Sequence, residues 1–261
     1  MKNSFRYIFG PVYSWRLGVS LGIDPVSDKS KLCNFDCVYC QLGDTPVLTV
    51  ERKVYVPTAE VVEEIKDLPD VQIDHLTFSG RGEPTLAANL GEMIRALRKI
   101  RREKIAVITN SSLMDHEDVR QDLALADYIL AKLDVCDQYS LGQINRAVHK
   151  VDFRNIVAGI QIFRKRFKGK LALQLMFIED NKPFARQLAE LARSINADEV
   201  QINTPLRPSA VRPLTREELD EIKICFSGLP AVTVYEKERK SYIPLNEAAT
   251  KKRHGNYRVP R

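Results

Sequence analysis

The sequence predicts an α/β protein in the form of a partial (β/α)6 barrel, with a curved parallel sheet and helices on its outer side. The first observation is size: 261 residues, 44% of them hydrophobic, suit a single α/β barrel with a substantial core. The second is that helical and strand patterns alternate from residue 57 onward. The third is that the apolar runs have strand length, and buried strands joined by helical crossovers form a parallel sheet.

Six segments are predicted to be buried strands, because each is a short apolar run that ends in glycine or polar residues. They span residues 16–25, 73–80, 105–112, 126–135, 170–180 and 198–205. Six helices alternate with them, at residues 57–68, 90–102, 115–125, 153–167, 185–195 and 215–228. The helix at 153–167 repeats apolar residues at intervals of three and four, and Thr215 with Glu218 forms a capping box at the start of the last helix.

The chain is predicted to divide into two parts. Residues 1–229 hold the barrel with an N-terminal lead-in, and residues 230–261 form a C-terminal extension with one further strand and a basic tail. No apolar run approaches the roughly 20 residues that a membrane helix needs. The N-terminal stretch lacks the pattern of a secretory signal. We therefore expect a cytoplasmic protein that does not contact a membrane.

Polar loops follow the predicted strands at their carboxyl ends, the edge that holds the ligand site in parallel α/β folds. The loops read "KLCNFDCVYCQLG" (31–43), "GRGEPT" (80–85), "NSS" (110–112), "LDVCD" (133–137), "IED" (178–180) and "NTPLRP" (203–208). The first loop contains three of the five cysteines, Cys33, Cys37 and Cys40, with the spacing C-x3-C-x2-C. A structural zinc site closes with four protein ligands, and no fourth ligand is nearby in the sequence. Three thiolates instead suit a 4Fe-4S cluster whose fourth iron stays open to substrate.

This cysteine motif, with Tyr39 just before the third cysteine, resembles the signature of the radical S-adenosylmethionine (radical SAM) superfamily. The resemblance implies that Cys33, Cys37 and Cys40 hold the 4Fe-4S cluster and that S-adenosylmethionine chelates the open iron through its amino and carboxylate groups. It implies further that one electron cleaves S-adenosylmethionine and that the resulting 5′-deoxyadenosyl radical abstracts hydrogen from the substrate. The implied partner is a reduced flavodoxin- or ferredoxin-type electron donor.

The stretch "FSGRGEPTL" (78–86) resembles the glycine–glutamate motif of this superfamily, whose backbone binds the amino group of S-adenosylmethionine. Glycine permits a close approach of the backbone, and Pro84 stiffens the turn. The resemblance makes the following residues candidate contacts of the cofactor: Tyr39, Gly80, Gly82, Glu83, Asn110, Ser111, Ser112, Asp134, Gln174, Met176 and Asn203. A second interpretation stays open for the Asn, Ser and Gln residues, which also serve as turn formers or core amides.

Lys132 and Cys136 are candidates for a catalytic role, because both lie at the end of the fourth predicted strand beside Asp134. The resemblance implies that Lys132 and Asp134 meet the ribose or carboxylate of S-adenosylmethionine, and Cys136 is a candidate for a catalytic or radical-quenching role. Cys225 is expected to be a buried, inert thiol in the last helix. Four arginines are either solvated surface residues or cations near the active edge that meet a substrate phosphate or carboxylate: Arg16, Arg81, Arg146 and Arg207.

Longer stretches extend the resemblance to one family within the superfamily. They are residues 10–24, 37–43, 76–94, 107–113 and 144–160, which resemble the tRNA-wyosine-synthase-related (imidazoG synthetase-like) proteins. Wyosine-forming enzymes condense pyruvate with N-methylguanosine in tRNA and carry a second cluster on three further cysteines upstream. This sequence has no cysteine before Cys33, so the resemblance implies a tRNA nucleotide as substrate class without the same reaction.

The charge of the chain bears on the class of substrate. The net charge of +6 at pH 7 favours an anionic partner such as RNA. Basic residues cluster at 95–104, 163–170 and 251–261, and each cluster is interpreted either as solvated surface or as an RNA contact. The alternatives to tRNA are a peptide, protein or small metabolite as substrate, or a non-catalytic zinc or iron–sulfur binding module.

Overall fold

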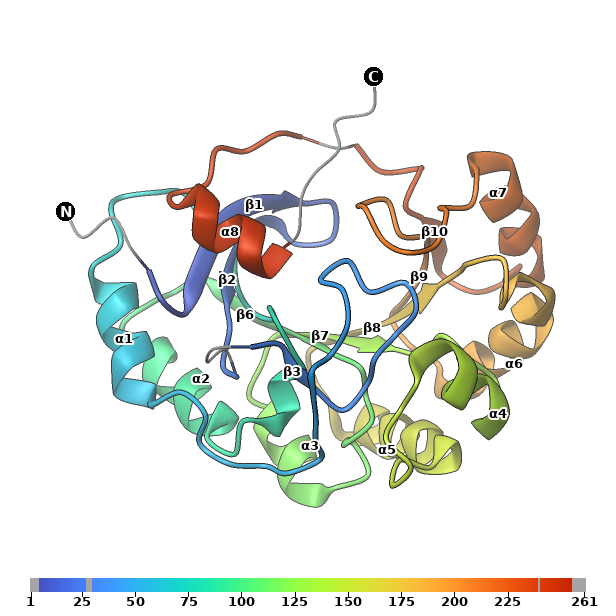
Figure 1. Ribbon diagram of the computed structural model, residues 1–261, viewed down its shortest axis with the longest axis horizontal. Coiled ribbons are helices and arrows are strands. Elements are labelled where there is room, and N and C mark those ends of the chain that lie inside the picture. Colours follow the sequence, from blue (N-terminus) through green and yellow to red (C-terminus); the bar gives the residue numbers. More distant parts are fainter. Residues whose placement is uncertain (1–4, 27–29, 239, 255–261) are drawn as a thin grey trace.

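An open, curved sheet forms the centre of the fold. The computed structural model describes residues 5–26, 30–238 and 240–254, and within them the sheet has eight strands in the order β1-β2-β5-β6-β7-β8-β9-β10. Their bounds are β1 (Ile8–Ser14), β2 (Gly18–Ile23), β5 (His75–Phe78), β6 (Lys104–Thr109), β7 (Tyr128–Lys132), β8 (Lys170–Met176), β9 (Glu199–Asn203) and β10 (Ala231–Thr233). Neighbouring strands from β2 to β10 are parallel, and the sheet forms an arc (Figure 1). The predicted α/β partial barrel is confirmed. A separate parallel pair is formed by β3 (Leu32–Cys33), at the start of the cysteine loop, and β4 (Val47–Leu48), just after it.

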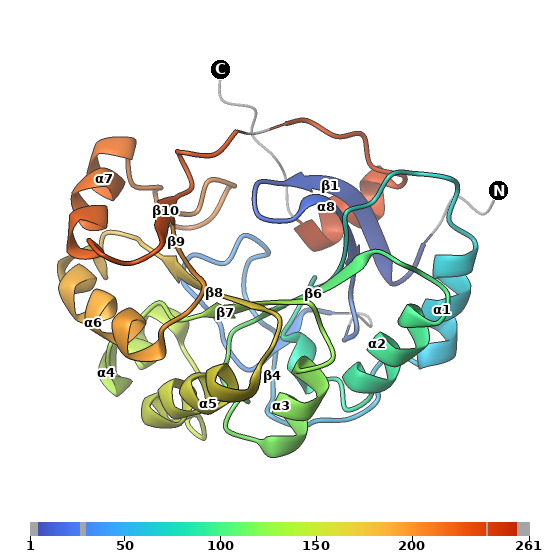
Figure 2. The same cartoon turned by 180° about the vertical axis from the view of Figure 1, so that it is seen from behind.

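Within the described residues, six main helices surround the outer side of the arc (Figures 1 and 2). They are α1 (Thr58–Lys66), α2 (Leu90–Arg98), α3 (Glu117–Leu123), α5 (Phe153–Arg166), α6 (Ala185–Ile195) and α7 (Arg216–Cys225). Shorter turns are α4 (Gln138–Ser140), a π-helical turn (Leu141–Asn145) and 3-10 turns at Pro84–Leu86 and Lys182–Phe184. The capping box is confirmed: Glu218 N–H donates to Thr215 Oγ1 over 3.2 Å, and Thr215 N–H donates to Glu218 Oε2 over 2.8 Å. In the described ranges, no helix has both the length and the apolar character that a membrane crossing requires.

The core lies between the sheet and the helices. In α6, Leu188, Ala189 and Ala192 recur on one face of the helix, and all three are fully buried. A second cluster packs inside the arc, where Leu17 from the β1–β2 turn meets Tyr128 and other side chains of the central strands. Because Leu17 precedes β2 and Tyr128 begins β7, this inner cluster lies toward the amino ends of the strands. The carboxyl ends are left to the loops that carry the predicted site.

Strand β1 is an element that the sequence analysis does not predict. It pairs antiparallel with β2, and Pro11 lies within it. Proline lacks a backbone donor and so argues against a strand in a sheet interior, but an edge strand tolerates it. The pairing register shifts between Phe9 and Val12, on either side of this proline. The strand predicted at residues 16–25 is therefore the second strand of the sheet, not the first.

The C-terminal extension adds two elements to the barrel. Strand β10 is the further strand that the sequence predicts here, and it pairs with β9. Where the sequence predicts a tail, the structure instead has helix α8 (Glu247–His254), which packs against β1 at the open side of the arc (Figures 1 and 2). Gly10 N–H donates to Thr250 Oγ1 over 2.9 Å, and Leu245 N–H donates to the Gly10 carbonyl over 2.8 Å. Residues 255–261 of the predicted basic tail lie outside the described residues, and a division of the chain at 229/230 stays a prediction.

Candidate active site

The cysteine loop follows β2 and lies on the concave side of the sheet (Figure 1). Its backbone is tied to the segment that follows β7. Asp36 and Val38 donate their N–H groups to the carbonyls of Asn145 and Ile144, over 2.9 and 3.0 Å. The π-helical turn after β7 therefore supports the cysteine loop from one side.

Each sulfur of the motif has a nitrogen donor beside it. Asn110 Nδ2 lies 3.8 Å from Cys33 Sγ, Asn145 Nδ2 lies 3.4 Å from Cys37 Sγ, and Lys31 Nζ lies 3.1 Å from Cys40 Sγ. Burial raises the pKa of Cys33, and it raises the pKa of Cys37 to about 11. The charge of Lys132 and the Asn145 hydrogen bond act on Cys37 in the opposite direction, because both favour a thiolate. Burial outweighs these two effects in the protein alone, and the nitrogen donors beside the sulfurs are groups that would stabilise a thiolate once the sulfur binds iron.

Whether the three cysteines of the motif can hold a 4Fe-4S cluster depends on the chemistry of their side chains and neighbours. In the described part of the chain, no three His, Cys, Asp or Glu side chains are grouped so that they could hold a metal ion. An iron–sulfur cluster differs from a single ion, because its cysteines bind separate irons. All three cysteines of the motif are free and half-buried on one loop, with N–H or ammonium donors next to them. Soft sulfur donors of this kind suit a cluster.

The glycine–glutamate loop lies directly against the cysteine loop. Leu32 N–H donates to the Arg81 carbonyl and Glu83 N–H donates to the Leu32 carbonyl, both over 3.3 Å. Only glycine fits at position 82, because a Cβ there would stand 1.7 Å from the Leu32 carbonyl oxygen. Gly80 has φ of +131°, a conformation that favours glycine. The two loops that the motifs single out therefore form one backbone-bonded unit.

Glu83 joins this unit to the end of β6. Its side chain is buried, and Oε1 accepts hydrogen bonds from the hydroxyls of Thr85 and Thr109, over 2.7 and 2.6 Å. Oε2 accepts from the Asn110 backbone N–H over 2.7 Å. Burial raises the pKa of Glu83, and these hydrogen bonds oppose the shift. The carboxylate holds the loop in place, which agrees with a motif that binds its ligand through the backbone.

Asn34 is a residue of this region that sequence reasoning missed. It is fully buried, its Oδ1 accepts from Asn110 Nδ2, and its Nδ2 donates to Ser112 Oγ, each over 2.6 Å. Ser111, between these two partners, has a left-handed φ of +68°. The Asn110 and Ser112 side chains thus hold the cysteine loop. The only signal for Asn34 is its place inside the cysteine motif, and a single asparagine there also suits a turn.

The end of β7 lies on the other side of the cysteine loop. The buried Tyr39 hydroxyl is hydrogen-bonded to Asp134, and Asn145 Nδ2 donates to the Tyr39 oxygen over 2.8 Å. Lys132 Nζ is 3.3 Å from Asp134 Oδ2 and 4.9 Å from the centre of the Tyr39 ring. Burial and the Asp134 carboxylate raise the pKa of Tyr39, so the phenol stays protonated. Asn145 was not among the predicted residues, yet it links Cys37 with this group.

Gln174 and Asn203 lie in the sheet beside this group. Gln174 is in register with Lys132 on β7, and Asn203 is in register with Met176 on β8. Residues in register on neighbouring strands point to the same face of the sheet. Gln174 and Lys132 therefore lie on one face. Gln174, Met176 and Asn203 are all buried. The predicted residues of these strands thus come together near the cysteine loop, and their role as cofactor contacts stays a prediction.

The same segments carry the family match. The model of the Radical SAM superfamily matches residues 29–192, which include the cysteine loop, the glycine–glutamate loop and the end of β7. The chain belongs to the radical SAM superfamily. It is therefore a radical SAM enzyme, a class whose members use a 4Fe-4S cluster and S-adenosylmethionine and need a reductant. The chain is also 40% identical over 218 residues to "UPF0026 protein slr1464" of Synechocystis sp., across 83% of this chain and 81% of that protein, so it belongs to the UPF0026 family.

Solved structures share the fold. TYW1 with a lysine-pyruvate adduct bound superposes with a TM-score of 0.60 at 16% identity, over 80% of this chain and 74% of that chain. Streptococcus suis SuiB bound to precursor peptide SuiA superposes with a TM-score of 0.62 at 15% identity, over 81% of this chain and 48% of that chain. At these identities the likeness shows the radical SAM fold alone.

The two cysteines outside the radical SAM motif are both half-buried. Cys136 follows β7, and its Sγ lies 3.8 Å from Asp137 Oδ2. Burial and the Asp137 carboxylate raise the pKa of the Cys136 thiol. Cys225 is the last residue of α7 and is not fully buried, which corrects the prediction of a buried thiol. The reason is that the helix ends at this residue, so its side chain is covered only in part.

The arginines named in the sequence analysis are spread over the barrel. Arg81 lies in the glycine–glutamate loop, and Arg146 Nη1 is 3.7 Å from Asp36 Oδ2 in the cysteine loop. Arg16 lies in the β1–β2 turn, at the amino end of β2, where its Nε donates to Gln201 Oε1 over 2.7 Å. Strand β1 makes this segment a hairpin turn, so Arg16 lies half-buried at the amino end of β2, and a contact between Arg16 and substrate stays a prediction.

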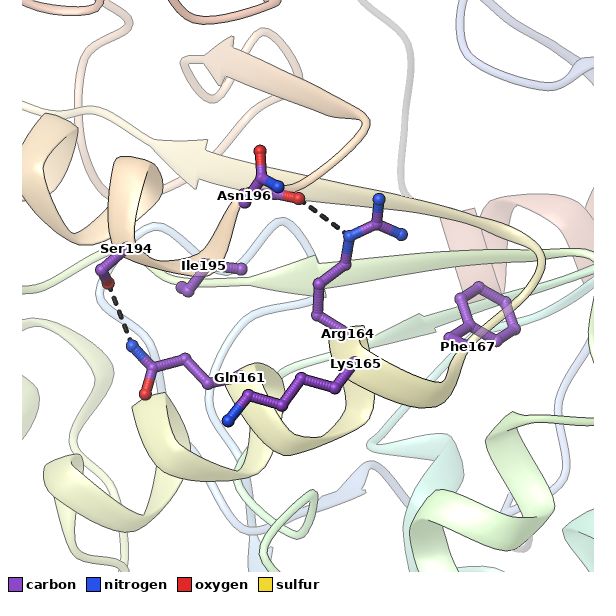
Figure 3. Close-up of a pocket in the computed structure, with 7 residues that line it drawn as sticks. All are labelled: Gln161, Arg164, Lys165, Phe167, Ser194, Ile195 and Asn196. Carbon is purple, nitrogen blue, oxygen red and sulfur yellow. Dashed lines mark hydrogen bonds between the residues drawn. The ribbon is translucent and has the colours of Figure 1, made fainter.

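A pocket of about 600 Å³ lies apart from the radical SAM motifs, between α5 and α6 (Figure 3). It is lined by Gln161, Arg164, Lys165, Phe167, Ser194, Ile195 and Asn196. These residues belong to the carboxyl ends of the two helices, which lead into the amino ends of β8 and β9. Arg164 is engaged there with Asp198 over 2.8 Å and with the Asn196 carbonyl over 2.8 Å. The pocket is therefore at the end of the barrel opposite to the cysteine loop.

Proposed function

We propose that this radical SAM enzyme holds a 4Fe-4S cluster on Cys33, Cys37 and Cys40 and uses it to cleave S-adenosylmethionine, with a tRNA nucleotide as the substrate. The observation that carries the cofactor part is the backbone bonding between the cysteine loop and the glycine–glutamate loop through Leu32. One loop would carry the cluster and the other would bind the amino group of S-adenosylmethionine. Their direct contact would hold both cofactors at a constant separation.

The residues of the chain have separate tasks in this proposal. The thiolates of the motif would bind three irons, and the nitrogen donors of Lys31, Asn110 and Asn145 would tune the cluster, since hydrogen bonds to sulfur change its potential. When bound, the cluster supplies the electron that cleaves S-adenosylmethionine. The backbone of Gly80 to Glu83 would orient its amino group.

The group at the end of β7 would complete the site. Lys132, held by Asp134 and Tyr39, would meet the ribose or carboxylate of S-adenosylmethionine. Gln174 and Asn203 would line the adjoining part of the pocket. The raised pKa of Cys136 keeps its thiol protonated near neutral pH, which is the state that a donor of a hydrogen atom to a radical requires.

The choice of a tRNA nucleotide as substrate rests on the charge of the chain and on resemblance. The net charge is +6, and motifs over much of the chain resemble the tRNA-wyosine-synthase-related family. TYW1 is among the solved structures that share the fold. A reduced flavodoxin- or ferredoxin-type donor and a cytoplasmic location belong to the same proposal.

The test is anaerobic formation of 5′-deoxyadenosine by the iron-reconstituted, reduced protein, with and without total tRNA from its own source. Strong stimulation by tRNA supports both parts of the proposal. Slow formation that tRNA does not change keeps the cofactor part and turns the substrate search toward peptides and small metabolites. No formation by protein with a full iron content overturns the cofactor part. Cys37→Ala is expected to lose iron and activity, whereas Cys225→Ala, a control outside the motif, is expected to keep both.

A further inference from the structure

We infer that the C-terminal helix α8 is part of the S-adenosylmethionine site, because Arg253 positions Asp24 and Asp24 positions the glycine–glutamate loop. Neither residue belongs to a motif that the sequence analysis singles out. The inference rests on the proposed function, since it assigns these residues to the cofactor loop of that site. Both would be positioning residues, which act through the loop rather than by touching the reacting atoms.

Asp24 directly supports the start of the glycine–glutamate loop. It follows β2 and is fully buried. Its Oδ2 accepts the Arg81 backbone N–H over 3.0 Å, and its Oδ1 accepts the Val26 N–H over 3.3 Å. A Cβ on Gly80 would stand 2.6 Å from Asp24 Cγ, so the carboxylate packs against the Gly80 backbone. The position of Asp24 therefore sets the position of Gly80 and Arg81.

Arg253 supplies the charge that faces Asp24. Arg253 Nε lies 3.3 Å from Asp24 Oδ2, and only 4% and 0% of the two side chains are exposed. The Arg253 guanidinium also donates to the carbonyl of Arg6, just before β1. The next residue of the helix, His254, accepts a hydrogen bond from Arg207 at its carbonyl. The end of α8 is thus held from both sides of the open arc, by the segment before β1 and by the segment after β9.

Because the Arg253–Asp24 ion pair is buried, the position of the glycine–glutamate loop depends on helix α8. If the arginine is removed, the Asp24 carboxylate loses the buried cation that faces it, which favours uptake of a proton or a shift toward water. Either change weakens its hydrogen bond to the Arg81 N–H. Backbone groups bind a ligand well only when they are accurately placed. A small displacement of the glycine–glutamate loop would therefore weaken S-adenosylmethionine binding. The cysteine loop is bonded to the same segment at Leu32, so a displacement small enough to keep those backbone bonds would weaken S-adenosylmethionine binding and leave the iron content unchanged.

The experiment compares Arg253→Met with Lys251→Met, which makes the same change of charge at an exposed position of α8. Both full-length variants are reconstituted with iron and sulfide, and their iron content and thermal unfolding are measured. The affinity for S-adenosylmethionine is then determined from the change it causes in the electron paramagnetic resonance spectrum of the reduced cluster. For Arg253→Met we expect at least tenfold weaker binding and a raised KM for S-adenosylmethionine, with a smaller change in kcat and a normal iron content. Lys251→Met is expected to match wild type.

Wild-type affinity in a folded, iron-loaded Arg253→Met variant overturns the inference. If that variant does not fold, Arg253→Lys keeps the charge, and amide hydrogen exchange at Arg81 becomes the readout. Faster exchange than in wild type supports the inference, and unchanged exchange refutes it. A wild-type protein that holds its cluster but does not bind S-adenosylmethionine contradicts the proposed function instead, and exchange at Arg81 still tests the link between helix and loop.

Discussion

Two polar regions of this barrel use the same kinds of side chain at opposite ends of the strands. The first, the carboxyl-end network, consists of Asn34, Glu83, Thr109, Asn110 and Ser112, all of them buried and hydrogen-bonded to one another. The second is the α5–α6 pocket (Figure 3), where Gln161 donates to Ser194 over 3.1 Å and Arg164 pairs with Asp198. Its polar groups are exposed or half-buried.

The difference between the two regions is one of water access. A buried polar group that loses its partner costs about 1–3 kcal/mol, whereas an exposed ion pair contributes about 0–1 kcal/mol. Only the carboxyl-end network therefore constrains the loops around it strongly. A large cavity between helices is a poor guide to the active site of this protein, and a dense buried network beside the cysteine loop is a better one.

Gly82→Ala is expected to have the largest effect, because it inserts a Cβ against the Leu32 backbone where the two loops meet. The protein is expected to lose about 3 kcal/mol or more of its free energy of unfolding. Iron binding is expected to fall, since the cysteine loop must move. Urea unfolding and iron analysis measure both effects. The control is Gly142→Ala, where a Cβ meets nothing within 4 Å. Equal stability and iron content in the two variants would show that the loops do not pack as described.

Glu83→Gln is expected to rank second. Whichever way the amide is oriented, its NH2 group replaces an acceptor of the Asn110 N–H or of the threonine hydroxyls. We expect a loss of about 2–3 kcal/mol in the free energy of unfolding. The exposed Glu117→Gln is the matched control and is expected to stay within about 0.5 kcal/mol of wild type. A loss no larger than that of the control in urea unfolding would contradict the buried role of Glu83.

Deletion of one amide in each region gives the most direct comparison. Asn34→Ala removes one buried hydrogen-bond partner from Asn110 and one from Ser112, which stay bonded to each other, and we expect it to cost about 1–3 kcal/mol. Gln161→Ala removes a hydrogen bond to the exposed Ser194, and its effect is expected to lie within about 0.5 kcal/mol. Thermal and urea unfolding of the two variants measure the difference. Similar costs at both sites would remove the distinction drawn between the two regions.

The smallest expected effect concerns Glu218, outside both regions. Hydrogen bonds from Arg212 and from the Thr215 N–H lower the pKa of Glu218 to about 2, from an ordinary value of 4.5. Because the folded state binds this proton more weakly than the unfolded state, the contribution to stability is present above pH 4.5 and is lost as the pH falls through 2. The stability difference between wild type and Glu218→Gln, from urea unfolding at several pH values, is expected to shrink over that range. A difference that does not change with pH would contradict the shift.

The sequence predicted most strands and helices because their apolar patterns are local. Strand β1 escaped prediction because Pro11 interrupts it, and helix α8 escaped because it is short and strongly basic, with few apolar residues to show a face. In the site, the spacing of the cysteines indicates the first motif, and resemblance to the radical SAM superfamily indicates the glycine–glutamate motif. Asn34 and Asn145 were not found, because an isolated polar residue has no periodic signal that separates a structural role from a turn.

The kind of fold and the sulfur ligands could thus be inferred from the chain alone, since hydrophobic periodicity and motif spacing are properties of short segments. Tertiary structure decided which side chains support those motifs. Asp24 meets Arg253, and Asn145 meets Cys37, across long stretches of intervening sequence. Such pairs form only when the sheet curves and brings its edges and loops together, so the contacts that hold the site are not visible in any local pattern.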